Sequence, residues 1–488
     1  MNRLAFVASL ALFVAACSQP EESETGPAPR PVPTLTKVVR TQLASLAPEA
    51  PATVAPADEE EVRGLIAGTQ SSMARMVTAS EEAIRELGAA GGERLVRLIA
   101  DESIDDAEKT GAIRLLGALG DRGATEALLN LIETSEVPWV RAHASWQLAN
   151  VTDPWFMPRL ILRLKYEKDR ETVLWIVDTL AKHGNYSGAT VLESLWADEN
   201  EPEGIRTAAG QKLAELRALS GAPEDVSVSS YWLDDQVEPK PASDAYRHEV
   251  WRWIERLHEY QLRGVDDARF ILERSDRHAA SLLGRALSDE DRYIRVHACQ
   301  CLARMGKRAR VAEADMVTLL GDPIAAHEAT KALGRVDTET AEAELLHEIQ
   351  HSKNPEVQIT AARALRWRLA GASQTAKDLI QGLADDAATL PELRQAALET
   401  SAYLGQLDRA GLESLVEFSI DPMFEADSSV RALEYYVATN GDEELVRAFH
   451  ELAPQGGEVI SNEERVRSRG ERASLLMDNL DALFPVGD

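Results

Sequence analysis

Apolar residues recur along the chain at a spacing that predicts helices with one buried face. The clearest example begins at Asp291, where Ile294, Ala298 and Leu302 follow three, seven and eleven residues later, and Gly306 closes the stretch. Residues three to four apart share one face of an α-helix, and glycine is a common helix terminator. This stretch is therefore predicted to be an amphipathic helix that begins after an acidic cap.

The same pattern is repeated at a nearly constant interval. Four copies lie between residues 105 and 214, and their equivalent positions Gly117, Ala149, Ala181 and Ala214 are 32, 32 and 33 residues apart. A second amphipathic segment precedes each copy, for example at residues 124–133 and 157–164. Further copies begin at Asp291, Asp322 and Asn354, and looser ones follow. Each repeat is therefore predicted to be a pair of helices.

These repeats predict an all-α fold, an α-solenoid of helical pairs. Aromatic residues make up only 5% of the 488 residues, and runs that alternate Val, Ile and Thr are almost absent. A chain of this length exceeds one compact core, whereas repeats spread the core along a line. The period breaks at residues 220–245, which are rich in proline and polar residues. We therefore expect two arrays, at 61–219 and 246–488, joined by a linker or long loop.

The repeat resembles the HEAT repeat, and most closely its short form, the PBS-lyase HEAT-like repeat. The resemblance rests on Asp before the second helix, Val-Arg or Ile-Arg in its first turn, a small residue at position seven and Leu-Gly at its end. In that family Asp and Arg form a ladder between repeats, which would carry over to Asp291 and Arg295. The enzymes that give the repeat its name attach bilins to proteins, but a shared scaffold does not carry that activity.

The N-terminus resembles a bacterial lipoprotein signal peptide. Residues 1–16 combine Arg3 with an apolar run, and small residues precede Cys17. The run is too short to span a bilayer. The resemblance implies cleavage before Cys17, lipid attachment to that cysteine and, from Ser18 behind it, an outer-membrane address facing the periplasm. We therefore expect a lipid-anchored protein of the bacterial cell envelope.

Residues 17–60 are rich in Pro, Ala, Glu, Ser and Thr, and they predict a disordered tether between the anchor and the first array. Within it, residues 38–46 have the composition of one or two weak helical turns.

The charge of the chain excludes some partners. With 52 Lys and Arg against 81 Asp and Glu the net charge is −29, and loss of Arg3 with the signal makes it 51 − 81 = −30. Such a chain repels phosphate backbones, so nucleic acid is not expected as a partner. Cys299 and Cys301 lie two residues apart on one predicted helix, which is poor geometry for a mutual disulfide, and they are predicted to be buried hydrophobic residues.

One motif suggests metal chemistry. His347, Glu348 and His351 spell H-E-x-x-H, which in zinc proteases places two ligands and a general base on one helical face. Here the motif ends the first helix of a repeat, and no His, Asp or Glu between Val357 and Lys377 provides a third ligand at a familiar distance. We therefore predict no metal or cofactor, with His347 and His351 as the alternative metal pair.

Aromatic residues form a better candidate surface. Positions two, six and nine of the second helix share a face away from the core, and the resemblance to HEAT-like solenoids places second helices on the concave side. The residues at these positions are Trp139, His143 and Trp146 in one copy, Trp175 in the next, and Tyr293, His297 and Gln300 in the opening stretch. They are a predicted face for a protein or peptide, although rings at these positions also suit packing between neighbouring repeats.

Together these observations favour a lipid-anchored scaffold or adaptor that binds protein and is not an enzyme. Two alternatives stay open. One is an enzyme or accessory subunit with a metal at His347 and His351, and the other is a structural spacer in the envelope.

Overall fold

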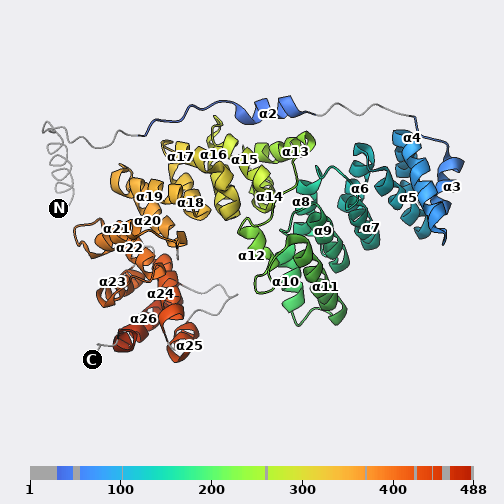
Figure 1. The fold of residues 1–488 in the computed structure, drawn as a ribbon. Coiled ribbons are helices and arrows are strands. Elements are labelled where there is room, and N and C mark those ends of the chain that lie inside the picture. The colour runs from blue at the N-terminus through green and yellow to red at the C-terminus, as the bar shows by residue number, and fades with distance from the viewer. Residues whose placement is uncertain are drawn as a thin grey trace, which may run out of the picture.

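The computed structural model describes residues 30–47, 55–101, 103–258, 262–368, 371–421, 426–441, 443–452 and 462–484. Within these ranges the chain is built from helices, and the one β-type contact is an isolated bridge between Thr36 and Asp289. The helices stack side by side into an arch that runs from α3 at one end to α26 at the other (Figure 1). The predicted all-α solenoid is confirmed.

The first array consists of helical pairs over the first half of the chain. Its helices are α3 (Glu59–Thr69), α4 (Ala74–Ala100), α5 (Asp106–Leu119), α6 (Arg122–Thr134), α7 (Pro138–Leu148), α8 (Met157–Tyr166), α9 (Arg170–Lys182), α10 (Ala189–Ala197) and α11 (Glu203–Ser220). Helix α4 is kinked at Gly88, where φ is +55°, a conformation that glycine adopts without strain.

The second array continues the stack to the C-terminal end. Its helices are α13 (Asp244–Glu255), η1 (Arg256–His258), α14 (Leu262–Arg274), α15 (Arg277–Ala286), α16 (Arg292–Met305), η2 (Gly306–Ala312), α17 (Glu313–Leu319), α18 (Ala326–Val336), α19 (Glu339–His351), α20 (Pro355–Ala364), η3 (Leu365–Arg368), α21 (Gln374–Asp385), α22 (Pro391–Tyr403), α23 (Arg409–Ile420), α24 (Ala426–Asn440), α25 (Glu443–Glu451), α26 (Asn462–Asp478) and α27 (Leu480–Leu483).

The acidic residue that opens the repeat caps its second helix. The carboxylate of Asp105 accepts a hydrogen bond from the N–H of Glu108, and Asp169 accepts one from Thr172 in the same way. A carboxylate at this position satisfies a free backbone donor and stabilises the positive end of the helix. The recurring acid is thus explained by local helix chemistry.

The residue at position seven lies where second helices of neighbouring repeats meet, and a small side chain lets them approach closely. The alanines at this position are fully buried: Ala112, Ala144, Ala298, Ala329 and Ala361.

A buried ion pair links consecutive repeats. Arg295 of α16 contacts Asp322 of the next repeat at 2.9 Å, and both side chains are almost completely buried. Arg141 of α7 makes a two-point contact with Glu167 at 2.8 and 2.9 Å. The ladder suggested by the resemblance is present at these two steps, with each arginine reaching forward to an acid ahead of the following second helix.

The two arrays form one continuous stack. Helices α8 and α14 pack against each other, and Lys165 pairs with Asp267 at 2.8 Å. The segment predicted as a linker contains α12 (Val228–Leu233), whose Trp232 is buried. Its side chain lies beside Tyr186 of the first array and under Arg308 of the second. Apolar residues in this segment therefore seal the junction.

The second array has an inner and an outer row of helices. Second helices of successive repeats pack closely together, for example α16 with α18 and α18 with α20, whereas the first helices α17 and α19 barely meet. A stack bends toward its more closely packed row. In Figure 1, α18, α22 and α24 accordingly face the inside of the bend.

An N-terminal strap, residues 30–47, lies along the outside of the arch (Figure 1). It contains α2 (Val38–Leu46), which packs on α13. Thr36 pairs through its backbone with Ser288 and Glu290 at 2.9 and 2.8 Å, and Val39, only 1% exposed, donates its N–H to Asp289.

The strap differs from the disordered tether predicted for residues 17–60. Its apolar residues gain a partner surface that the composition of the segment alone does not reveal. The predicted signal peptide and Cys17 lie outside the described residues.

No described helix is long and apolar enough to cross a bilayer. Cys299 and Cys301 are free thiols and fully buried, as predicted, and burial raises the pKa of both.

Candidate protein-binding surface

The four aromatic residues predicted in the first array form one continuous row on the second helices α7 and α9. Trp139 contacts His143 edge-on at a centroid distance of 5.8 Å, and His143 contacts Trp146 at 6.1 Å. Trp146 then meets Trp175 of the next repeat at 5.8 Å. Spacings of three and four residues bring the first three rings to one helix face, and close packing of α7 on α9 brings the fourth. We call these four residues the aromatic row.

The row packs between two repeats and also leaves one ring exposed. Trp139, His143 and Trp175 are half-buried and fill the junction between two repeats, whereas Trp146 is 38% exposed. A rigid, partly exposed indole supplies much contact area at little entropic cost, which is why tryptophan is enriched among energetically dominant interface residues.

Charged groups hold one end of the row. The ammonium group of Lys212 on α11 lies 5.1 Å from the centre of the Trp175 ring and bonds the buried carboxylate of Asp178 at 3.1 Å. Lys182 pairs with the other carboxylate oxygen at 3.0 Å. Asp178 is therefore a neutralised anchor for Lys212, and a cation–π contact keeps the Trp175 ring in place.

Tyr293, His297 and Gln300 form a second group, on α16 in the second array. The rings of Tyr293 and His297 stack with centroids 6.5 Å apart, and Nδ1 of His297 lies 2.7 Å from the carbonyl oxygen of Leu257. His297 thus also ties α16 to the preceding repeat.

In the H-E-x-x-H motif, the acid Glu348 binds the N-terminal strap. His347 and His351 lie side by side on α19 with ring centroids 4.8 Å apart. Glu348 is buried and accepts a hydrogen bond from Nε of Arg30 in the strap at 2.6 Å. Across the described part of the chain, no three His, Cys, Asp or Glu side chains gather as metal ligands would.

A basic groove that was not predicted from the sequence lies on the inner face of the second array. It is a hollow of about 460 Å³ between α14, α16, α18, α20 with η3, and α24. Seven Lys or Arg side chains and one carboxylate, Glu328, line it, and Gln300 of the predicted face lies at its edge. The sequence does contain a pattern that indicates this groove: Lys and Arg recur at positions nine and thirteen of successive second helices, as at Arg304, Lys331 and Arg335.

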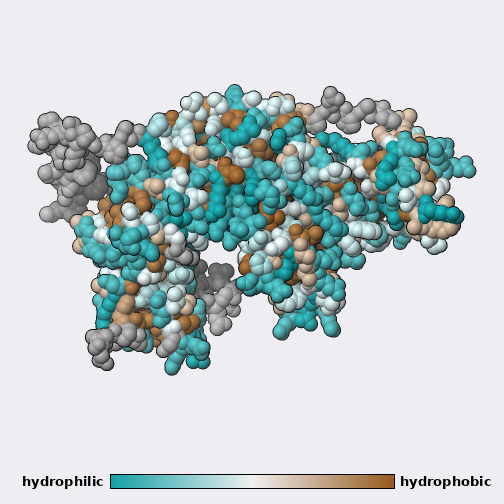
Figure 2. Space-filling model, in the orientation of Figure 1, coloured by the Kyte–Doolittle hydropathy of each residue, from teal (hydrophilic) through white to brown (hydrophobic). Residues whose placement is uncertain are grey.

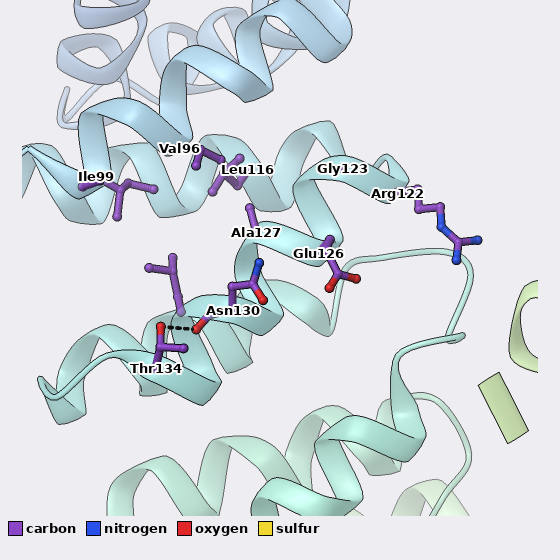
Figure 3. A pocket seen from close by; sticks show the side chains of 11 residues that line it. Val96, Ile99, Leu116, Arg122, Gly123, Glu126, Ala127, Asn130 and Thr134 are labelled. Carbon is purple, nitrogen blue, oxygen red and sulfur yellow. Dashed lines mark hydrogen bonds between the residues drawn. The ribbon is translucent and has the colours of Figure 1, made fainter. Parts of the chain in front are cut away.

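An apolar pocket of about 590 Å³ lies at the other end of the arch, between α4, α5 and α6 (Figure 3). Val96, Ile99 and Leu116 line its apolar side. Asn130 and Thr134 close one edge, where the Thr134 hydroxyl donates to the backbone oxygen of Asn130 at 2.7 Å.

Comparisons with known proteins add little beyond the helical architecture. The chain matches no protein-family model, and no curated protein matches it in sequence. Among solved structures, human deoxyhypusine hydroxylase aligns at 17% identity over 59% of this chain and 97% of its own, with a TM-score of 0.23. An engineered protein aligns at 17% identity over 86% of this chain and 99% of its own, with a TM-score of 0.22. Importin beta aligns at 13% identity over 87% of this chain and 67% of its own, with a TM-score of 0.31.

Proposed function

We propose that this protein is a scaffold of the bacterial cell envelope that binds another protein through the aromatic row on α7 and α9. The aromatic row carries the proposal. It presents an exposed indole, Trp146, on a surface fixed by ring contacts and by the pairing of Lys212 with Asp178. A preorganised surface loses little entropy when a partner docks.

The proposal also places a lipid on Cys17 after removal of residues 1–16. The lipobox-like residues before Cys17 and the small polar Ser18 behind it support an outer-membrane anchor. Metabolic labelling with a palmitate analogue tests the anchor, because Cys17→Ser removes the proposed acceptor thiol, while Cys299 and Cys301 are buried, and should abolish the label. Label retained in Cys17→Ser would contradict it.

The binding face is tested by removing the row and comparing captured partners. Crosslinked envelopes are purified with the wild-type chain, with Trp139→Ala/Trp146→Ala/Trp175→Ala, and with Trp196→Ala. Trp196 is 59% exposed on α10, outside the aromatic row, so its loss is a matched control. Residues of this kind contribute about 2 kcal/mol or more each at the centre of an interface, which predicts a loss of binding of at least about 30-fold.

Two results decide the proposal. A stoichiometric protein captured by the wild-type chain and by Trp196→Ala, but lost with the triple variant, is expected. The same proteins recovered with all three chains, at matched melting temperatures, would overturn it.

A further inference from the structure

The basic groove reverses the charge balance of the rest of the molecule. The chain carries 81 Asp and Glu against 52 Lys and Arg, yet seven cations and one carboxylate line this hollow. The surface seen in Figure 2 is mostly hydrophilic, with only small scattered apolar patches. Solubility is already provided by the acidic surface, so it does not explain why seven cations are clustered in this groove.

Three of the cations already have acidic partners in the structure. Arg269 lies 3.6 Å from Glu273, Lys331 lies 3.2 Å from Glu328, and Arg363 lies 2.9 Å from Glu399. These are Arg269 of α14, Lys331 of α18 and Arg363 of α20.

The other four have no carboxylate within ion-pair distance in the described part of the chain: Arg304, Arg335, Arg366 and Arg431. Burial, together with the charges of Arg366 and Arg304, lowers the pKa of Arg335 to about 10. Burial also lowers the pKa of Arg366. These cations repel each other at short range, and an anion placed among them would relieve that repulsion.

The guanidinium groups are held ready for such an anion. Arg335 stacks on the ring of Trp367 with its central carbon 3.2 Å from the ring centre, and Arg366 lies 5.0 Å from the same centre on η3. Stacking fixes the plane of a guanidinium while its N–H edge stays available to a carboxylate. Nε of Arg366 is buried and has no hydrogen-bond partner among the described residues.

We propose that the basic groove binds an extended acidic segment of a partner protein. Its cations come from successive inner helices, and packed helices lie about 8 to 10 Å apart. Six to ten residues of extended chain cover about 20 to 30 Å and bring several carboxylates past them. A single phosphate reaches only part of this column.

Nucleic acid suits the groove less well than an acidic peptide does. A long polyanion would continue past the groove onto a chain whose net charge is −29. A short acidic segment ends within the hollow. This inference goes beyond the aromatic row, since the groove lies on other helices and can bind its ligand whether or not the row binds.

Fluorescence anisotropy with a labelled ten-residue peptide of alternating Glu and Ser tests the proposal, with a Gln and Ser peptide as the neutral match. We expect the acidic peptide alone to bind, and to bind less tightly as salt rises. Arg335→Gln/Arg366→Gln is expected to weaken binding by about tenfold or more, because charge-assisted hydrogen bonds are lost. Arg431→Gln, at an exposed position, provides a second variant that leaves the interior untouched.

Two control variants test whether peptide binding depends on the groove itself, and not on surface charge in general or on the aromatic row. Arg97→Gln/Arg247→Gln removes two cations that pair with Glu93 and Asp244 elsewhere on the surface, and it should bind as the wild-type chain does. The triple tryptophan variant should also bind the acidic peptide fully, so a failure of either proposal leaves the other open to test. Equal binding of both peptides, full binding by Arg431→Gln, or displacement of the peptide by inorganic phosphate at low millimolar concentration would overturn the inference.

Discussion

Arg30 donates a hydrogen bond from Nε to Oε1 of Glu348 at 2.6 Å, across 318 positions of sequence. The contact joins the start of the strap to the acid of the H-E-x-x-H motif, and the second acid on that face, Glu344, also pairs with Arg30. The acid that would be the general base of a zinc protease is thus part of a docking site for the N-terminal segment.

We predict that Arg30→Ala loosens the strap without unfolding the arch. A half-buried pair of this kind contributes about 1 kcal/mol or somewhat more, so the amide of Thr36, which bonds Ser288, should exchange with solvent about fivefold to tenfold faster. Hydrogen exchange measured by mass spectrometry checks this. Arg40→Ala, at an exposed position on α2, is the matched control and should leave the exchange unchanged.

Gly321→Ala tests the same docking from the other side. A Cβ at Gly321 would lie 2.2 Å from the backbone oxygen of Pro31, so the start of the strap must move away. We expect faster exchange at residues 30–36 and an unchanged melting temperature. Gly204→Ala on α11, where a Cβ meets nothing within 4 Å, should leave the exchange at residues 30–36 unchanged. Unaltered exchange in Gly321→Ala would show that Pro31 does not rest there.

Arg295 and Asp322 are expected to be strongly coupled. Arg295→Met leaves a nearly fully buried carboxylate without its partner, and such a loss destabilises a fold by about 3 to 5 kcal/mol. Arg295→Met/Asp322→Asn removes both charges and should recover more than half of that loss. A double-mutant cycle on thermal unfolding measures the coupling, and additive effects of the two single changes would contradict it.

Glu167 should make stability depend on pH. Burial alone would raise its pKa, but hydrogen bonds from Arg141, from the N–H of Asp169 and from Arg163 lower the pKa to about 2. A lowered pKa stabilises the fold above the unfolded-state value of about 4.5, and that stabilisation is lost as pH falls from there toward 2. Its size is on the order of 2 kcal/mol after allowance for solvent screening.

The comparison that isolates this effect is Glu167→Gln. The free energy of unfolding of the wild-type chain should exceed that of the variant at pH 7, and the difference should narrow as the pH drops from 5 to 3. A difference that stays constant over this range would mean that Glu167 does not titrate as expected.

The fold could be predicted because its determinants are local and repeated. Position seven is alanine in most copies, as at Ala298 and Ala329, and an acid such as Asp105 caps the following helix. Each rule acts within one or two repeats, so one sequence displays it several times. The ladder was predicted at Asp291 and Arg295, and the structure instead pairs Arg295 with Asp322 of the next repeat.

The strap and the groove were harder to predict, for different reasons. Val39 is buried only because α13 lies against it, more than 200 residues away in sequence, and composition averaged over a proline-rich segment does not reveal such a pairing. The cations of the groove were visible in the repeat register, but a net charge of −29 conceals a local excess of opposite sign. Trp146 and Trp175 meet because they hold equivalent faces of α7 and α9 and these two helices pack together.

The docked strap also limits the distance between the membrane and the folded helices of a lipidated chain. With Arg30 fixed to α19, only thirteen steps of chain separate it from Cys17, and a chain of that length reaches at most about 45 Å. If the whole segment up to residue 60 were free, the tether between Cys17 and the folded array would be much longer and would attach at α3. In the proposed anchored form the tether therefore attaches to the outer side of the second array, at α19, and leaves the basic groove on the opposite side of that array uncovered by it.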